Sequence, residues 1–131
     1  MEDRTAGIAG ADALAAVARA AGLVVAMESR TTAPLFFEDG QLMLAPVFSV
    51  KVTVTAPVPK GTFPAQAARL HRLRLVAHWS EQREAGHRAR FLDASYTPYE
   101  GRGRKTSRSA TARGYLDMLK AAYADILNEC V

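Results

Sequence analysis

Residue types and motifs that often reveal a function are scarce in this sequence. Cys130 is the only cysteine, so no internal disulfide can form. His71, His78 and His87 show none of the regular spacings that metal ligands share. The segment Gly101–Arg108 lacks the glycines of a P-loop or a dinucleotide-binding loop, and no nucleophile elbow or catalytic triad is evident. We therefore expect no metal, no cofactor and no catalytic residue, and an enzyme is the less favoured hypothesis.

Long apolar segments are missing as well. No run reaches the roughly 18 uninterrupted apolar residues that a membrane-spanning helix needs. The chain starts with Met1-Glu2-Asp3-Arg4 and an alanine-rich stretch, which differs from the basic start and apolar run of a signal peptide. We expect no membrane contact and a cytoplasmic protein. The 131 residues, 49% hydrophobic and 23% charged, predict one globular domain over 1–131.

Positive charge is concentrated in the second half of the chain. Residues 1–66 contain five basic and six acidic residues, whereas 69–113 contain eleven basic and four acidic residues. Clustered charge of one sign creates a local field that attracts ligands of the opposite sign. The distribution therefore favours a polyanionic partner for the region 69–113.

Hydrophobic periodicity predicts a helix at each end and strands between them. Gly22 is expected to end the first helix, Asp39-Gly40 is a turn signal, and the prolines from Pro57 to Pro64 predict a loop. Thr106, Ser107 and Ser109 are candidate N-caps of the last helix. The predicted helices span Ala9–Ala21 and Ser109–Cys130, and the predicted strands Leu23–Met27, Pro34–Phe37, Val47–Thr55, Leu70–Ser80 and Arg88–Tyr96. This order indicates an α+β fold, an antiparallel sheet of about four strands with an N-terminal and a C-terminal helix packed on one face.

Alternation along the predicted strands places basic residues on the face away from the helices. Leu73, Leu75 and Trp79 would face the core. The opposite side would then carry Lys51, Arg72, Arg74, His78, Arg88 and Arg90. Like charges on adjacent strands repel, so such a face requires neighbouring acids or an anionic partner. An ordinary solvated surface, with arginine stems covering apolar sheet, is the alternative. Asp93 is expected to end a strand.

A second basic element is the segment Gly101–Arg108 before the last helix. Unpaired backbone N–H groups at a helix start bind anions, and the arginines and hydroxyls of this segment add phosphate donors. The segment Gly101–Ala112 and the coarse element order resemble the double-stranded-RNA-binding domain, which has a Gly-x-Gly-x-basic loop at the start of its second helix. The paired lysines of that family are missing, so we carry none of its function over. A mobile basic loop with an N-cap is the alternative.

Aromatic and apolar residues leave further interpretations open. Trp79 and Phe91 are expected in the core, with Tyr96 and Tyr99 at a strand end, although aromatics beside arginines also suit base stacking. Apolar residues in a loop-like region and a wide apolar stripe on the last helix indicate an interface between copies. The loop-like cluster comprises Phe36, Phe37, Leu42, Met43 and Leu44.

The function predicted from these features is that of a small non-enzymatic binding protein. Its basic face and Gly/Arg segment would engage nucleic acid or another polyanion through phosphate contacts. The residues expected to bind are Arg72, Arg74, Arg88, Arg90, Arg102, Arg104, Lys105 and Arg108. The alternatives are a homo-oligomeric structural or assembly component, of the virion or secretion-machine type, and an inhibitor that binds an acidic protein surface.

Overall fold

The computed structural model describes residues 8–32, 35–44, 46–81, 89–98 and 105–129. Three helices and seven strands lie within these ranges. The helices are α1 (Ala9–Ala20), α2 (Pro64–Arg72) and α3 (Ser109–Asn128). The strands are β1 (Val24–Thr32), β2 (Leu35–Glu38), β3 (Gln41–Leu44), β4 (Val47–Thr55), β5 (Arg74–Glu81), β6 (Arg90–Thr97) and β7 (Lys105–Thr106).

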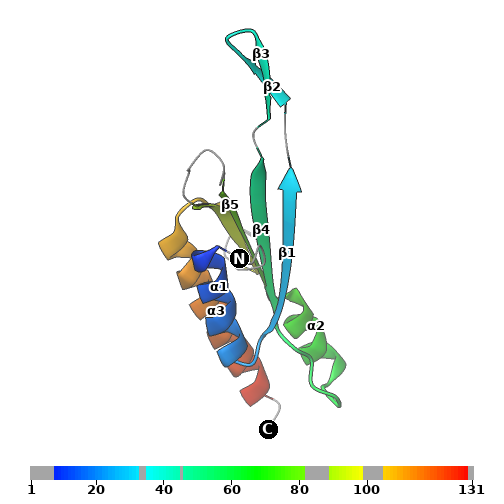
Figure 1. The fold of residues 1–131 in the computed structure, drawn as a ribbon. Helices are drawn as coiled ribbons and strands as arrows, with labels where there is room; N and C mark the ends of the chain where they lie inside the picture. The colour runs from blue at the N-terminus through cyan, green and yellow to red at the C-terminus, as the bar shows by residue number, and fades with distance from the viewer. Residues whose placement is uncertain (1–7, 33–34, 45, 82–88, 99–104, 130–131) are drawn as a thin grey trace.

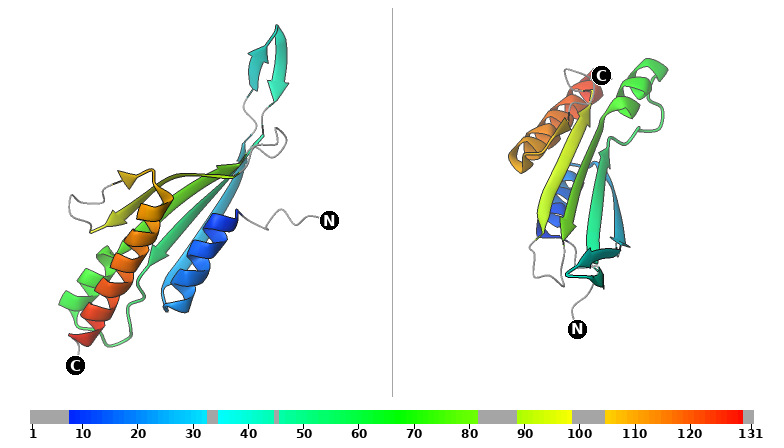
Figure 2. Two further views of the ribbon diagram at one scale, coloured as in Figure 1. Left: turned by 90° about the vertical axis from the view of Figure 1, so that its left-hand side faces the viewer. Right: turned by 90° about the horizontal axis from the view of Figure 1, so that it is seen from above.

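Five of the strands form one antiparallel sheet in the order β1-β4-β5-β6-β7. β2 and β3 pair with each other as a separate hairpin that projects from the end of β1 and β4 (Figure 1). α1 and α3 lie on the same side of the five-stranded sheet, α1 against β1 and β4 and α3 against β5 and β6 (Figure 2). The predicted α+β architecture, with both terminal helices on one face, is confirmed.

The core lies between these two helices and the sheet. Alternate residues of the central strands, Val50, Val52 and Val54 in β4 and Leu75 and Ala77 in β5, are buried toward the helices. α1 contributes Ala11, Leu14, Ala15 and Ala18, and α3 contributes Ala112, Tyr115, Leu116, Leu119 and Ile126. Buried residues recur every second position in β4 and β5 and about every 3.6 positions in α1 and α3, so each of these elements buries one side.

Aromatic contacts organise the β5–β6 side of the core. Trp79 meets Phe91 edge-to-face with ring centroids 5.4 Å apart, and Tyr96 stacks on Tyr115 at 6.0 Å. Trp79 and Tyr96 are buried. Trp79 also needs a glycine beside it, because a Cβ on Gly10 would lie 2.9 Å from the indole Nε1. The placement of Trp79 and Phe91 in the core is as predicted, whereas Tyr96 lies deeper than the strand end expected for it.

α2 is the largest departure from the prediction. Leu70, expected at the start of a strand, lies in this helix, and β5 begins only at Arg74. Pro64 occupies the first turn, where its fixed φ favours helix initiation, and alanine, glutamine, arginine and leucine continue it. Leu70 is buried in the core, and the buried alternation of Leu73, Leu75 and Ala77 begins at the C-cap of α2. The nine-residue helix was not predicted because the prolines before it predict a loop, and the alternation that begins at Leu73 was extended back to Leu70.

The β2–β3 hairpin and the length of β1 were also predicted incompletely. The expected Asp39-Gly40 turn is confirmed, with both residues at positive φ. The apolar segment around Leu42, expected to be loop-like, is instead the second strand of this hairpin. β1 continues to Thr32 in unbroken register with β4, five residues past the predicted end at Met27.

The predicted glycine at the end of α1 is confirmed, whereas the predicted side-chain cap at the start of α3 is not. Gly22 follows α1 with a φ of 82°, and the N–H groups of Gly22 and Leu23 donate to the carbonyls of Arg19 and Ala18. At α3 the N-cap is Arg108 and no side chain caps the helix. Thr106, one of the expected caps, instead accepts a hydrogen bond from the N–H of Arg108 at 3.2 Å.

Two glycine substitutions should change stability in opposite directions. Gly22→Ala forces a left-handed backbone onto a residue with a Cβ, and we expect it to lower the free energy of unfolding by about 1 kcal/mol. Gly114→Ala lies in the middle of α3, where an added Cβ meets nothing within 4 Å, so we expect a gain of about 1 kcal/mol. Urea denaturation of both variants measures the two changes. Shifts of the same sign would contradict the left-handed backbone at Gly22 or the helical backbone at Gly114.

Candidate functional site

The face of the sheet turned away from α1 and α3 is the candidate site, and we call it the open face. The strand registers assign the residues to it, because residues directly opposite each other on neighbouring strands share a face. Its described charged side chains are Arg30, Lys51, Arg74, Arg90 and Lys105, with Glu28 and Asp93 as the acids. Hydroxyl residues fill most of the remaining positions, namely Thr32, Ser49, Thr53, Thr55, Ser80, Ser95 and Thr97.

One row of three charged residues and a histidine crosses this face at right angles to the strands. Glu28, Lys51, His78 and Asp93 lie opposite one another on β1, β4, β5 and β6. The imidazole Nδ1 of His78 lies 2.6 Å from Oδ1 of Asp93, and the Nζ of Lys105 lies 3.4 Å from Oδ2 of the same carboxylate. Asp93 thus ties β5 to β6 and β6 to β7. It does not end a strand, as expected from the sequence, but occupies the middle of β6.

The environment of Asp93 favours its ionised form. Partial burial raises the pKa of this carboxyl, but hydrogen bonding and charge from His78, together with Lys105, outweigh burial and hold the pKa below its ordinary value. The carboxylate therefore persists into mildly acidic solution and neutralises part of the surrounding positive charge. It also leaves fewer free cations at the centre of the open face than the composition of the strands implies.

Among the described residues, the predicted arginines of the sheet region do not form one tight cluster. Arg74 lies opposite Thr97 at one end of the open face, whereas Arg90 lies opposite Ser80 at the other. Six residues along β5 separate these two positions, which corresponds to about 20 Å. Arg72 is not on the sheet at all, because it lies in the last turn of α2, where it is exposed. The expected side-by-side stack of arginines on adjacent strands is therefore replaced by a chain of separated cations.

The basic segment before α3 is only partly described. Lys105 lies in β7 on the open face with its side chain 71% exposed, and Arg108 is the exposed N-cap of α3. Arg88, Arg102 and Arg104 lie outside the described residues. The segment therefore joins the sheet edge at Lys105, beside Asp93.

Sequence reasoning missed Arg30, which lies on the open face opposite Ser49. The predicted strand ended at Met27, because the residues that follow are polar on both faces. Apolar and polar residues do not alternate along β1. The strand is exposed over nearly its whole length, so neither of its sides needs to be apolar. The continuous register with β4 is the signal that assigns Arg30 to this face.

Large aromatic side chains are absent from the described residues of the open face. Trp79, Phe91 and Tyr96 all point to the helix side, into or against the core. The face can therefore offer cations and hydroxyls to a ligand, but no ring on which a base could stack.

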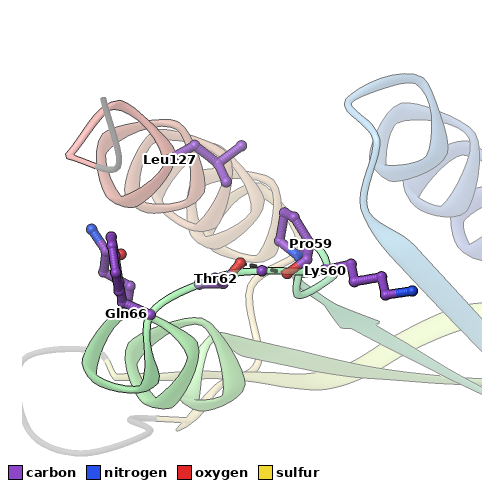
Figure 3. A pocket seen from close by; sticks show the side chains of 7 residues that line it. Pro59, Lys60, Thr62, Gln66 and Leu127 are labelled. Atoms are coloured by element: carbon purple, nitrogen blue, oxygen red, sulfur yellow. Dashed lines mark hydrogen bonds between the residues drawn. The ribbon is translucent and has the colours of Figure 1, made fainter.

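A small pocket lies apart from this site, between α3 and the segment that leads into α2 (Figure 3). Its volume is about 200 Å³, and its lining comprises Pro59, Lys60, Gly61, Thr62, Phe63, Gln66 and Leu127. The hydroxyl of Thr62 donates to the carbonyl of Pro59 at 2.5 Å, and Oε1 of Gln66 is buried without a hydrogen-bond partner among the described residues. The lining offers one ammonium, one hydroxyl and one amide group, which is not an acid–base pair.

Replacing Asp93 with asparagine should destabilise the protein in a pH-dependent manner. At neutral pH we expect the free energy of unfolding to fall by about 0.5–1 kcal/mol, allowing for solvent screening of the part-exposed partners. Because the folded-state pKa of Asp93 is lowered, the wild-type advantage is present above the unfolded-state pKa and is lost as the pH falls through the folded-state pKa. Chemical denaturation over a pH series measures the difference.

Asp117→Asn is the control, since it removes the same charge from an exposed position of α3. A D93N deficit that stays constant through the acidic range would contradict the described interaction of Asp93 with His78 and Lys105.

Comparisons of the chain with models of known protein families, with curated proteins and with solved structures find no match. Among the described helices, none combines the length and apolar character required to cross a membrane.

Proposed function

We propose that the open face binds nucleic acid through its phosphate backbone. The observation that carries the proposal is the charge of this face, where five described cations stand against two acids. Arg30, Arg74 and Arg90 are exposed, and the side chain of Lys105 is 71% exposed. Cations at such positions reach phosphates by extending their side chains, with no rearrangement of the sheet.

The chemistry of the face favours positioning contacts over readout of base identity. Arginine, lysine and hydroxyl side chains are the usual donors to phosphate oxygens, and such contacts carry no sequence information by themselves. The hydroxyls of Thr53, Ser80 and Ser95 lie between the cations. With no large aromatic among the described residues of the face, single-strand stacking contributes little. We therefore propose binding that depends weakly on sequence and does not require single strands.

The spacing of the cations is suited to several phosphates in succession. Arg74 and Arg90 stand about 20 Å apart, which spans roughly six base-pair steps of a duplex. Lys51 and Lys105 lie between the two ends. Asp93 neutralises part of this central charge, so the ends of the face dominate the attraction.

Removal of open-face charge should weaken duplex binding more than removal of charge elsewhere. We expect the triple variant Lys51→Gln, Arg74→Gln, Arg90→Gln to bind a duplex of about 12 base pairs at least tenfold more weakly at low salt. The slope of log affinity against log salt concentration should fall by about 2 to 3, since three phosphate contacts are lost. Fluorescence anisotropy over a salt series measures both quantities.

The matched control is the triple variant R19Q, R113Q and K120Q, which removes the same net charge from α1 and α3. We expect it to retain the wild-type salt slope. Equal losses of affinity in the two triple variants would show that binding depends on net charge and not on the open face. Absence of binding by the wild type at about 50 mM salt would also refute the proposal.

A homo-oligomeric assembly component is the second candidate function. The observation that favours it is β1, a long strand at the edge of the sheet with one side unpaired among the described residues.

A further inference from the structure

The outer edge of β1 exposes a row of backbone hydrogen-bonding groups. β1 is the first strand of the sheet order, and all nine of its residues pair with β4 on the inner side. No strand within the described ranges pairs with its outer side. Each residue of a strand directs its N–H and C=O toward one neighbour, so alternate residues of β1 present both groups to the outer side. At the opposite edge, the described part of β7 pairs with Ala94 and Ser95 of β6.

β1 lacks most of the features that protect edge strands from pairing with another chain. Such strands are usually short, bulged, or interrupted by proline or lysine. Val24–Thr32 contains neither proline nor lysine, and its register with β4 has no shift. The side chains of Val24 and Met27 are 50% and 36% exposed. The edge is therefore regular and accessible, with Glu28 and Arg30 as its charged residues.

We propose that β1 pairs antiparallel with β1 of a second copy of this chain, about a two-fold axis at Ser29. A two-fold axis perpendicular to the sheet keeps the open faces of both copies on one side. Residues directly opposite each other then share a face, so the axis lies between the two β1 strands at the level of a residue that is opposite its own copy. An axis at Glu28 or at Arg30 would place like charges opposite each other. An axis at Ser29 places Glu28 of each copy opposite Arg30 of the other, which gives two complementary charge pairs.

This register also matches the remaining side chains of β1. Ala26 lies opposite Thr32 of the second copy on the open face, and Met27 lies opposite Thr31 on the helix side. The pairing then extends over residues 26–32 of both copies and covers part of the exposed surface of Met27. β-Branched threonine beside an apolar residue is a favourable cross-strand neighbour. The two five-stranded sheets become one continuous sheet. The inference stands independently of nucleic-acid binding.

Charge reversal tests the pairing. Nuclease-treated wild-type protein should elute at twice the mass of the chain in size-exclusion chromatography with light scattering. Arg30→Glu turns both charge pairs into two opposed carboxylates, and Glu28→Arg turns both into two opposed guanidinium groups. Each single variant should therefore weaken dimerisation about tenfold or more.

The double variant E28R/R30E recreates both charge pairs with their signs exchanged and should restore the dimer. Arg19→Glu, in the last turn of α1, makes the same charge change as R30E away from β1 and should remain dimeric.

A cysteine at the axis tests the register directly. In a Cys130→Ser background, Ser29→Cys brings two thiols together, since residues directly opposite in an antiparallel pair have Cα atoms about 4.5–5.5 Å apart, within disulfide range. Thr31→Cys on the same face is the control, because its two copies would lie about 14 Å apart, four residues along the strands and one strand spacing across. Mild oxidation should give a covalent dimer for S29C and not for T31C.

A wild-type monomer at every concentration tested would overturn the proposal. A dimer that R30E leaves intact, or that S29C does not cross-link, would overturn it as well. Circular dichroism of each variant identifies unfolded protein, and the gain of dimer in the double variant cannot arise from unfolding.

Discussion

The pleat of one antiparallel sheet, covered by helices on one side only, governs both the packing and the surface chemistry of this protein. Every strand sends alternate side chains to opposite faces, so the two helices divide the central strands β4 and β5 into a buried and an open set. Val50, Val52 and Val54 of β4 and Leu75 of β5 are buried under α1 and α3. The remaining residues of the same strands carry the charges and hydroxyls of the open face. A shift of one residue in register would exchange the two sets, which is why the core and the open face are specified together.

The local charge on the open face depends on which residues lie opposite each other on neighbouring strands, and not only on the number of basic residues. The row across four strands places an acid, a base, a histidine and a second acid side by side, namely Glu28, Lys51, His78 and Asp93. Asp93 contacts both His78 and Lys105, so it stabilises the β5–β6–β7 side while it reduces the local positive field. Arg74 and Arg90 lie beyond this row at the two ends. The proposed phosphate contacts therefore extend along the face, with its centre partly neutralised.

The two edges of the sheet suit different roles. Within the described residues, β7 pairs with Ala94 and Ser95 of β6 at one edge and is followed by α3, whereas β1 is an edge strand of nine residues at the other. If β1 pairs with a second copy as proposed, the open faces of both copies lie on the same side of a continuous sheet. The proposed binding surface would then double in width without any change within either copy. Assembly and polyanion binding are in that sense compatible properties of one architecture.

Local periodicity and the conformational preferences of single residues made parts of the fold predictable, and other parts not. The alternation in Val47–Thr55 predicted β4 with its bounds, and Gly22 and Asp39-Gly40 predicted a helix end and a turn, because those backbones suit glycine or aspartate. α2 was missed because the prolines before it predict a loop, and the predicted strand extended the alternation that starts at Leu73 back to Leu70. β1 was predicted too short because its polar half has no periodicity, and pairing with β4 extends it to Thr32.

The sequence was enough to predict that basic residues lie on the face away from the helices. It was not enough to predict how these residues are placed relative to one another. Alternation along the chain was enough to direct Arg74 and Arg90 away from the core, and composition was enough to show that the second half of the chain is basic. Folding in three dimensions was needed to put Arg72 in a helix, to separate Arg74 from Arg90, and to bring Arg30 and Asp93 onto the same face. This division arises because periodicity is a property of neighbours along the chain. The residue opposite on the next strand is instead set by register, which depends on turns and packing far away in sequence.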